Sequence, residues 1–394
     1  MDYPESGLDL AAEARRKVFE QAGDDVGVIV ASHPPIKGYL SGYFSMHHDL
    51  NPRYLSAVVA GRETAALVVS AADAGPAVEA LGDPALVHRY GFFCFEAAGP
   101  ADPQGYDGPG SPGFEEAVVA ALAATAPAGT VIGVDRSNGD GLWTLIREAR
   151  GVDRVVDVTR AIGEARKTKL DGEVARIAKA TKLVEEGIQA VVAEAAVGMT
   201  ELEAASLIAA CMVRGGGNPR LISVTSGPRS ALADCYPKSR KVEPGDLLRI
   251  DAGCVVQGYT SDMARTLVFG EPDRLQATRY NAIRVGLEEE LQMIRAGAST
   301  RRIFEDTVGI VRRSGIPTYR RQHVGHGIGL AGSYDFPLLA PGSDATLEAG
   351  MCLCVETPYY VLGWGGMMVE DTIRVTETGY EPITTIPRDM VSVG

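Results

Sequence analysis

Two symmetrical pairs of carboxylates in the second half of the chain could bind metal ions. Asp251 and Asp262 flank a Gln257-Gly258 turn between two β-rich runs, which predicts a β-hairpin. With the hairpin centred between Val256 and Gln257, the two aspartates are expected to face each other directly. Opposed carboxylates repel, and burial raises the cost, so this pair requires a cation or a shared proton. A metal ion is the simpler solution.

A second predicted hairpin repeats the arrangement with Glu356 and Glu370, which are equidistant from Gly363. Just upstream, the glycine-rich segment HVGHGIG (residues 323–329) adds an imidazole. This oxygen-rich set suits Mn²⁺, Fe²⁺ or Co²⁺ better than structural Zn²⁺. Four negative charges balance two dications, so we expect a pair of ions about 3.5–4 Å apart, which would generate hydroxide at neutral pH.

The elements that must position these residues divide the chain near residue 160. Before this point, short apolar runs alternate with helical patterns, which indicates an α/β domain, interrupted by a Gly-, Pro- and Asp-rich loop at residues 96–112. After it, helical periodicity predicts one long amphipathic helix over residues 164–196. Thr200 and Glu203 form a capping-box pattern that predicts a second helix, ending near Val213.

Composition excludes several classes of function. With 38 Lys and Arg against 51 Asp and Glu, the formal charge is −13, so nucleic acid is not an expected partner. The N-terminus has no signal-peptide pattern, and the longest uncharged stretch, residues 117–134, is broken by Pro127 and Gly129, so no membrane partner is expected. Six cysteines without a CxxC pair indicate reduced thiols and a cytoplasmic protein.

Three stretches resemble the pita-bread superfamily of creatinase, prolidase, aminopeptidase P and methionine aminopeptidase. They are EPGDLLRIDAGCVVQGYTSDMARTLVFG, HVGHGIGL and LEAGMCLCVETPYYVLGWGGMMVEDTIRVTETG, and the resemblance spans nearly the whole chain. It implies a creatinase-type α/β N-terminal domain over residues 1–160 and an α+β pita-bread catalytic domain over residues 161–394. It also implies a homodimer and two divalent ions (Mn²⁺, Fe²⁺, Co²⁺ or Zn²⁺, with Mn²⁺ favoured). The superfamily's metal ligands fall on Asp251, Asp262, His326, Glu356 and Glu370.

The auxiliary residues depart from the resemblance. Asp234 replaces a histidine of prolidase-like members, Gln322 replaces another although His323 is adjacent, and Met368 replaces an arginine. A third histidine is absent where this chain reads Ser333-Tyr334-Asp335. We expect Glu356 to carry a proton to the leaving nitrogen, with Asp234 and His323 as further catalytic residues.

Four residues are candidate substrate contacts. His48 and Arg53 lie in a segment resembling the creatinase-type loop that reaches the partner subunit's active site, although a solvated polar loop would look the same. Arg320 could hold a substrate carboxylate, or could mark a charged strand edge. Tyr334 offers a phenol in place of the third histidine.

The sequence therefore predicts a dinuclear metal-dependent hydrolase. Because the auxiliary histidines are missing, we expect it to cleave a C–N bond of a small molecule, in the manner of creatinase or ectoine hydrolase. An Xaa-Pro peptidase acting on short peptides is the alternative, and a metal-dependent lyase or redox enzyme on the same scaffold is a different class. A binding module that has lost activity is disfavoured, because such a protein has no reason to keep clustered carboxylates.

Overall fold

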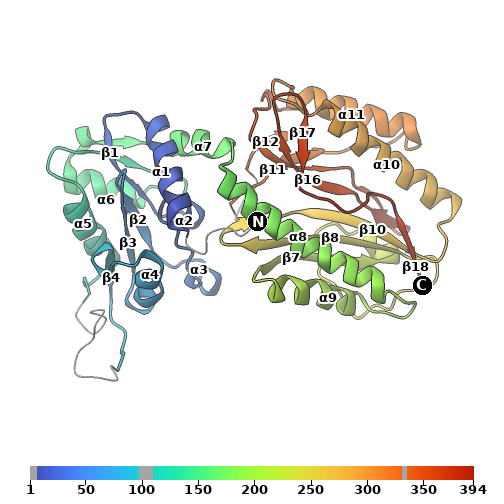
Figure 1. Ribbon diagram of the computed structural model, residues 1–394, viewed down its shortest axis with the longest axis horizontal. Coiled ribbons are helices and arrows are strands. Elements are labelled where there is room, and N and C mark those ends of the chain that lie inside the picture. The colour runs from blue at the N-terminus through green and yellow to red at the C-terminus, as the bar shows by residue number, and fades with distance from the viewer. Residues whose placement is uncertain (1–6, 97–109, 331–334) are drawn as a thin grey trace. The chain divides into compact units, whose positions relative to one another are not determined.

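The computed structural model describes residues 7–96, 110–330 and 335–394, and the chain forms two compact units (Figure 1). One unit extends to Arg166, and the other runs from Lys167 to Gly394. The boundary expected near residue 160 falls within the helix that joins them, α7 (Thr159–Lys167).

The N-terminal unit is built on a six-stranded mixed sheet with the order β4-β3-β2-β1-β5-β6. Strand β2 runs antiparallel to both of its neighbours, whereas β5 and β6 continue parallel to β1, and β4 is parallel to β3. The central strands consist mainly of Val, Ala, Ile and Leu and are buried along almost their whole length, as expected where both faces of a sheet are covered. The strands are β1 (Val26–Ala31), β2 (Ala57–Ala60), β3 (Ala65–Ser70), β4 (Val87–Tyr90), β5 (Val131–Val134) and β6 (Val155–Asp157).

Helices complete this α/β unit. Helices α5 and α6 share a hydrophobic core with one face of the sheet, while α2 contacts β2 and β3, and α1 packs on α2. The helices are α1 (Leu8–Ala22), α2 (Pro34–Ser41), α3 (His47–Leu50), α4 (Ala74–Leu81), α5 (Phe114–Thr125) and α6 (Gly141–Arg150). Most of the loop expected at residues 96–112 lies outside the described residues.

The second unit contains a ten-stranded sheet whose main path is β12-β11-β13-β16-β10-β8-β7. Three short strands extend it, because β17 pairs with β16, β18 with β10 and β9 with β8. The strands are β7 (Asn218–Ser226), β8 (Leu247–Val256), β9 (Tyr259–Thr260), β10 (Met263–Phe269), β11 (Gly325–Gly327), β12 (Asp335–Leu339), β13 (Cys352–Glu356), β16 (Glu370–Val375), β17 (Tyr380–Pro382) and β18 (Val391–Val393), beside a separate ribbon of β14 (Tyr359–Val361) and β15 (Gly365–Met367).

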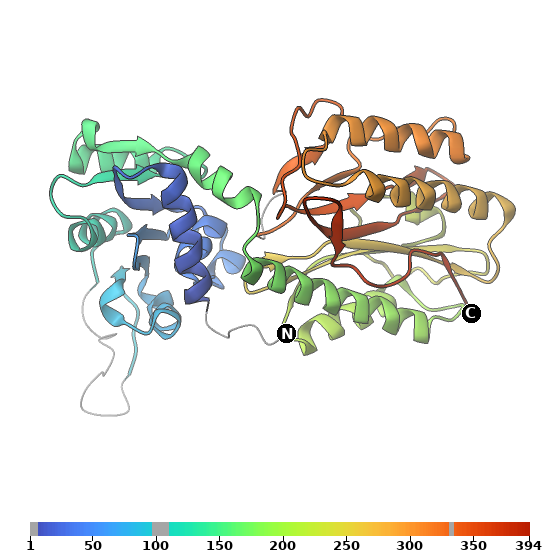
Figure 2. The same ribbon diagram turned by 45° about the horizontal axis from the view of Figure 1, so that its top comes forward.

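Two pairs of helices pack against different parts of this sheet (Figure 2). Helices α8 (Asp171–Glu194) and α9 (Glu201–Arg214) contact β8 and β7, whereas α10 (Arg274–Met293) and α11 (Thr300–Ser314) contact β13 and β12. A core of apolar side chains lies between α10, α11 and the sheet. This α+β arrangement leaves polar residues on the central strands available for a site.

The prediction of a single helix over residues 164–196 was wrong at its start. The chain leaves the helical path after Lys167, and α8 begins only at Asp171. Tertiary contacts of Lys169 explain the break: its backbone N–H donates to the Gly350 carbonyl at 2.7 Å, and its ammonium pairs with Asp335 at 2.9 Å inside the unit. The capping box of Thr200 at the start of α9 is confirmed.

Hairpin register was predicted correctly for one carboxylate pair and wrongly for the other. Glu356 lies directly opposite Glu370, as expected. Asp251 instead lies opposite Ala264, because the turn takes both Gln257 and Gly258, with φ values of 45° and 83°, as its central residues. That shifts the centre of the hairpin by one residue, so Asp251 and Asp262 are diagonal neighbours rather than opposed partners.

Within the described residues, no helix combines the length and the apolar character needed to cross a membrane.

Candidate metal centre

One row of cross-strand neighbours brings three of the predicted ligands together. Asp251 on β8 is opposite Ala264 on β10, which is opposite Glu370 on β16, which in turn is opposite Glu356 on β13. Because directly opposed residues of antiparallel strands share a face, these side chains project from the same side of the sheet. Ala264 lies between Asp251 and Glu370 in this row, and its small side chain leaves space between the two carboxylates.

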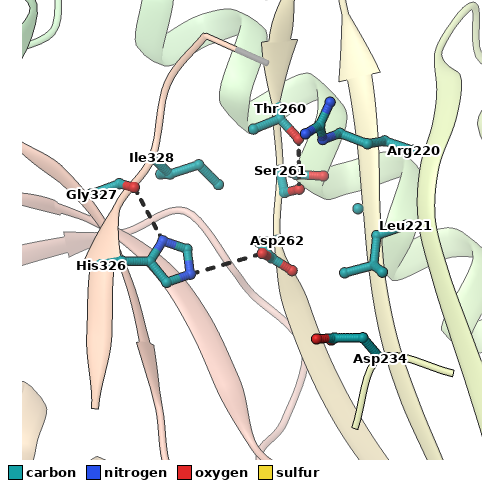
Figure 3. A pocket seen from close by; sticks show the side chains of 10 residues that line it. Arg220, Leu221, Asp234, Thr260, Ser261, Asp262, His326, Gly327 and Ile328 are labelled. Atoms are coloured by element: carbon teal, nitrogen blue, oxygen red, sulfur yellow. Dashed lines mark hydrogen bonds and ion pairs between the residues drawn. The ribbon is translucent and has the colours of Figure 1, made fainter. Parts of the chain in front are cut away.

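An adjacent row adds the remaining two ligands. Thr372 donates its hydroxyl to the Asp262 carbonyl at 2.7 Å, and its strand neighbour Cys354 lies opposite His326. His326 Nε2 is 3.9 Å from Asp262 Oδ2 (Figure 3). Because the Gly327 carbonyl can only accept, the contact of His326 Nδ1 with it at 3.1 Å assigns the proton to Nδ1. The acceptor lone pair is then on Nε2, as a metal ligand requires.

The two rows contain overlapping groups of possible metal ligands. Side-chain ligand atoms of Asp251, Asp262 and Glu370 all lie within 4.8 Å of one another, as do those of His326, Cys354 and Glu370. Burial raises the pKa of the Cys354 thiol well above its usual value. The thiol is therefore uncharged at neutral pH, and the carboxylates and imidazole are the better ligands.

Burial makes this cluster electrostatically unfavourable without cations. Asp251 has its pKa raised to about 6, chiefly by burial, against the opposing charge of Arg249. Burial and the neighbouring carboxylates raise the pKa values of Asp262 and Glu370 well above their usual range. Burial lowers the pKa of His326, which keeps its imidazole neutral. Bound divalent cations would offset this repulsion between carboxylates.

Glu356 has a different environment from the other carboxylates. Its Oε1 is 3.0 Å from His323 Nδ1 and accepts from Arg321 Nη2 at 3.2 Å. Burial alone would raise its pKa, but the hydrogen bond from His323 and the charge of Arg321 outweigh burial and hold the pKa below its usual range. Glu356 is therefore the carboxylate of this cluster most readily ionised.

The residues present fit a metal centre by a second criterion. Among the described residues, Asp262 Oδ1 and Glu370 Oε2 are buried oxygens without a hydrogen-bond partner. An unsatisfied buried carboxylate oxygen is costly, and a divalent cation satisfies it directly. Both orphaned atoms belong to residues of the same cluster, so the donor set suits divalent ions.

A pocket of about 760 Å³ opens onto this cluster. In Figure 3, Arg220 and Asp234 lie on either side of Asp262, with His326 across the pocket. Asp234 is thus placed at the pocket wall, where its charge raises the pKa of Asp251 and Asp262. The lining residues are Arg220, Leu221, Asp234, Gly253, Thr260, Ser261, Asp262, His326, Gly327 and Ile328.

The predicted substrate contacts have different environments. Arg320 lines a separate cavity with Phe304 and Pro341. In the N-terminal unit, His48 turns its Nε2 inward to Lys37 Nζ at 3.2 Å and Ser56 Oγ at 3.0 Å, and Arg53 is exposed. Tyr334, like Ser333, lies outside the described residues.

Two arginines near the cluster, Arg220 and Arg249, escaped the sequence interpretation, whereas a third belongs to the Arg320-Arg321 pair that was a candidate for holding a substrate carboxylate. Arg321, the neighbour of Arg320, is the one that reaches Glu356. Arg220 lines the pocket from β7, and Arg249 pairs with Asp251. For Arg249 a signal was available, because a lone arginine stands in the apolar run LLRIDAGCVV.

Comparison with known proteins identifies the family. The model of metallopeptidase family M24 matches residues 175–377, which include the whole cluster. The chain belongs to metallopeptidase family M24. A sequence relative, the Xaa-Pro dipeptidase of Pyrococcus horikoshii, is 26% identical over 262 residues, which cover 66% of this chain and 74% of the relative.

Solved structures of similar proteins extend the match to both units. The X-Pro aminopeptidase of Thermotoga maritima aligns with a TM-score of 0.78 at 20% identity, covering 96% of this chain and 99% of that one. The Xaa-Pro dipeptidase of Bacillus anthracis aligns with a TM-score of 0.76 at 23% identity, covering 97% and 99%. The expected pita-bread fold with its creatinase-type N-terminal domain is confirmed. As an M24 member, the chain is a metal-dependent hydrolase with divalent metal ions as cofactors.

Removing single ligands should empty the centre. We expect Asp262→Asn and Glu370→Gln each to abolish metal content and activity, since each removes a charge that paired cations need. Glu290→Gln is the matched control: among the described residues Glu290 is also buried without hydrogen-bond partners, and burial raises its pKa well above the usual value, but it is not a proposed ligand. Metal analysis of the purified variants by mass spectrometry checks this. Full occupancy in either ligand variant would refute the proposed centre.

The raised pKa of Asp251 predicts how stability depends on pH. Its folded-state value of about 6 exceeds its ordinary value of 3.8, so its contribution to stability is present below pH 3.8 and is lost as pH rises through about 6. We expect the Tm of metal-free protein to fall between pH 5 and 8, and Mn²⁺ to raise it more at pH 8. Asp251→Asn should flatten the pH profile. Scanning calorimetry measures both, and a Tm that rises over this range would contradict the assignment.

Proposed function

We propose that this chain is a metal-dependent dipeptidase that hydrolyses Xaa-Pro dipeptides. The observation that carries the proposal is the group of Asp251, Glu370 and His326, which are buried, with the half-buried Asp262. This group opens into a pocket in a chain related to an Xaa-Pro dipeptidase over 262 residues. A pocket of 760 Å³ has room for a dipeptide.

In this proposal the ligands hold two divalent ions, with Mn²⁺ favoured because oxygen donors predominate. The ligands would be Asp251, Asp262, His326, Glu356 and Glu370. When bound, the ions would polarise the scissile carbonyl and lower the pKa of water.

Glu356 is the proposed proton carrier. His323 and Arg321 both contact its Oε1, which keeps the carboxylate ionised and oriented. The proton that water loses would pass to Oε2 and then to the leaving proline nitrogen, which must be protonated to depart. His323 and Arg321 are positioning residues in this scheme, because they act through Glu356.

Opposite charges on the pocket wall suit a zwitterion. Asp234 and Arg220 lie on either side of Asp262 (Figure 3). A dipeptide has an α-ammonium group that can pair with Asp234 and a carboxylate that can pair with Arg220. The charge of Arg220 partly opposes the rise in the pKa of Asp262, which supports its position close to this carboxylate.

A small-molecule C–N hydrolase is the second candidate. It is favoured by Asp234, which stands where the resemblance places a histidine and gives the pocket wall an acceptor instead of a proton donor near pH 7. A cationic or zwitterionic amide would then be the substrate.

We also place the protein in the cytoplasm, since all six cysteines are free thiols.

We further propose a homodimer in which the segment around His47–Arg53 approaches the partner's pocket. Supporting this, Met46, immediately before α3, and Leu50 within it are each 68% exposed, and exposed apolar side chains close together can form part of an interface. Light scattering should give twice the 41.6 kDa chain mass. A fully active monomer would contradict the proposal.

Steady-state kinetics decide between the two candidates. With Mn²⁺, we expect kcat/KM for Ala-Pro above about 10⁴ M⁻¹s⁻¹, the lower end of the usual enzyme range. Ala-Ala is the control for proline preference. A value at least about a hundredfold lower, the contribution of one acid–base group, would favour the small-molecule hydrolase.

Arg220→Met should raise KM for Ala-Pro about tenfold, as expected for a lost charge-assisted contact, and leave KM for Ala-Pro-amide unaffected.

A further inference from the structure

Arg249 is a fully buried cation beside the metal centre. It lies on β8, two residues before Asp251, and its exposed fraction is 0%. A guanidinium has five N–H donors and cannot lose its charge, so complete burial requires partners for these donors. Such a residue in a buried strand needs a specific reason to be there.

Its contacts join two parts of the site. Nη1 donates to Asp251 Oδ2 at 3.1 Å, while Nη2 donates to the carbonyls of Leu232 and Ala233 at 2.8 and 2.5 Å. Nε donates to the Ser230 carbonyl at 3.1 Å. The residue that follows Ala233 is Asp234 on the pocket wall. One side chain therefore connects a proposed metal ligand to the segment that carries a proposed substrate contact.

The position of Arg249 in the sheet is also informative. It lies opposite Thr266, whose hydroxyl bonds both backbone groups of Met368, at 2.8 and 2.9 Å. These three residues lie beside the row of Asp251, Ala264 and Glu370. Met368 is 4% exposed and occupies the position where the resemblance expects an arginine. The guanidinium of Arg249 thus lies near the position of Met368. It comes from β8, however, which pairs with one edge of β10, whereas Met368 lies beside β16, which pairs with the other edge.

We propose that Arg249 is a positioning residue of the metal centre, which orients Asp251 by holding its Oδ2 and fixes the Asp234 segment to the same strand. The inference rests on the proposed centre but not on the choice of substrate. With Oδ2 bonded to Arg249, Asp251 has Oδ1 available for a metal ion. The ring of Tyr360, whose centroid is 5.4 Å from the guanidinium carbon, covers the arginine.

A merely structural role and a positioning role predict different results for Arg249→Met. With either role, the substitution should lower the Tm of the metal-free protein, because buried acceptors lose their donors. Only positioning changes the affinity of the folded protein for metal. Partners that orient a ligand are typically worth 10- to 100-fold in metal affinity. We therefore expect the Kd for Mn²⁺ to rise by about that factor.

The experiment is calorimetric titration of metal-free protein with Mn²⁺, at a temperature where each variant is folded. Arg240→Met is the matched control, because Arg240 braces the same region through Asp246 at 2.6 Å and Ser226 at 2.8 Å but contacts no proposed ligand. It should lower the Tm and leave the Kd unchanged. Arg249→Lys serves if the methionine variant does not fold, and since lysine lacks the planar fork, we expect about tenfold weaker binding.

The outcomes are distinguishable. A raised Kd in an Arg249 variant with an unchanged Kd in Arg240→Met supports the inference. An unchanged Kd in Arg249→Met, or in Arg249→Lys where only that variant folds, overturns it and leaves the metal centre intact. If the wild-type protein binds neither Mn²⁺ nor Co²⁺, the centre itself fails and the inference falls with it.

Discussion

Repulsion among buried carboxylates is the constraint on which the catalytic unit depends. Asp251, Glu356 and Glu370 project from one row of the sheet, and Asp262 adjoins them. Without cations, protonation lowers the repulsion within such a group, and the pKa values of Asp251, Asp262 and Glu370 are accordingly raised. Folding and metal binding are thus thermodynamically coupled here.

The surrounding residues contact some of these carboxylates and leave oxygens of others without hydrogen-bond partners among the described residues. Arg321 and His323 keep Glu356 ionised, and Arg249 holds one oxygen of Asp251. Asp262 and Glu370 retain buried oxygens without hydrogen-bond partners among the described residues. Arg321, His323 and Arg249 therefore contact Glu356 and Asp251, whereas the oxygens of Asp262 and Glu370 without such contacts are among those proposed to bind metal ions.

Membership of family M24 indicates the type of reaction, whereas the pocket wall concerns the choice of substrate. The fold and the ligand types determine that water can be activated beside a carbonyl, which is common to metal-dependent hydrolysis. Arg220 and Asp234 instead give the pocket wall opposite charges, and we propose that these charges select the substrate. The loss of expected histidines does not by itself exclude peptide substrates, since charged termini can be bound by other groups of suitable sign.

The sequence by itself determined the α/β character of the first part, the capping box at Thr200 and the opposition of Glu356 and Glu370, because turn chemistry and periodicity act over short distances. The α+β pita-bread fold of the second part was expected from the resemblance alone. The expected centre of the other hairpin, between Val256 and Gln257, was wrong by one residue, because a two-residue Gln257-Gly258 turn places the centre between those two residues. Only the tertiary structure decided that α8 begins at Asp171, that Arg321 rather than Arg320 reaches Glu356, and that Arg249 meets the segment before Asp234. These outcomes depend on contacts between residues far apart in the chain, which local patterns do not encode.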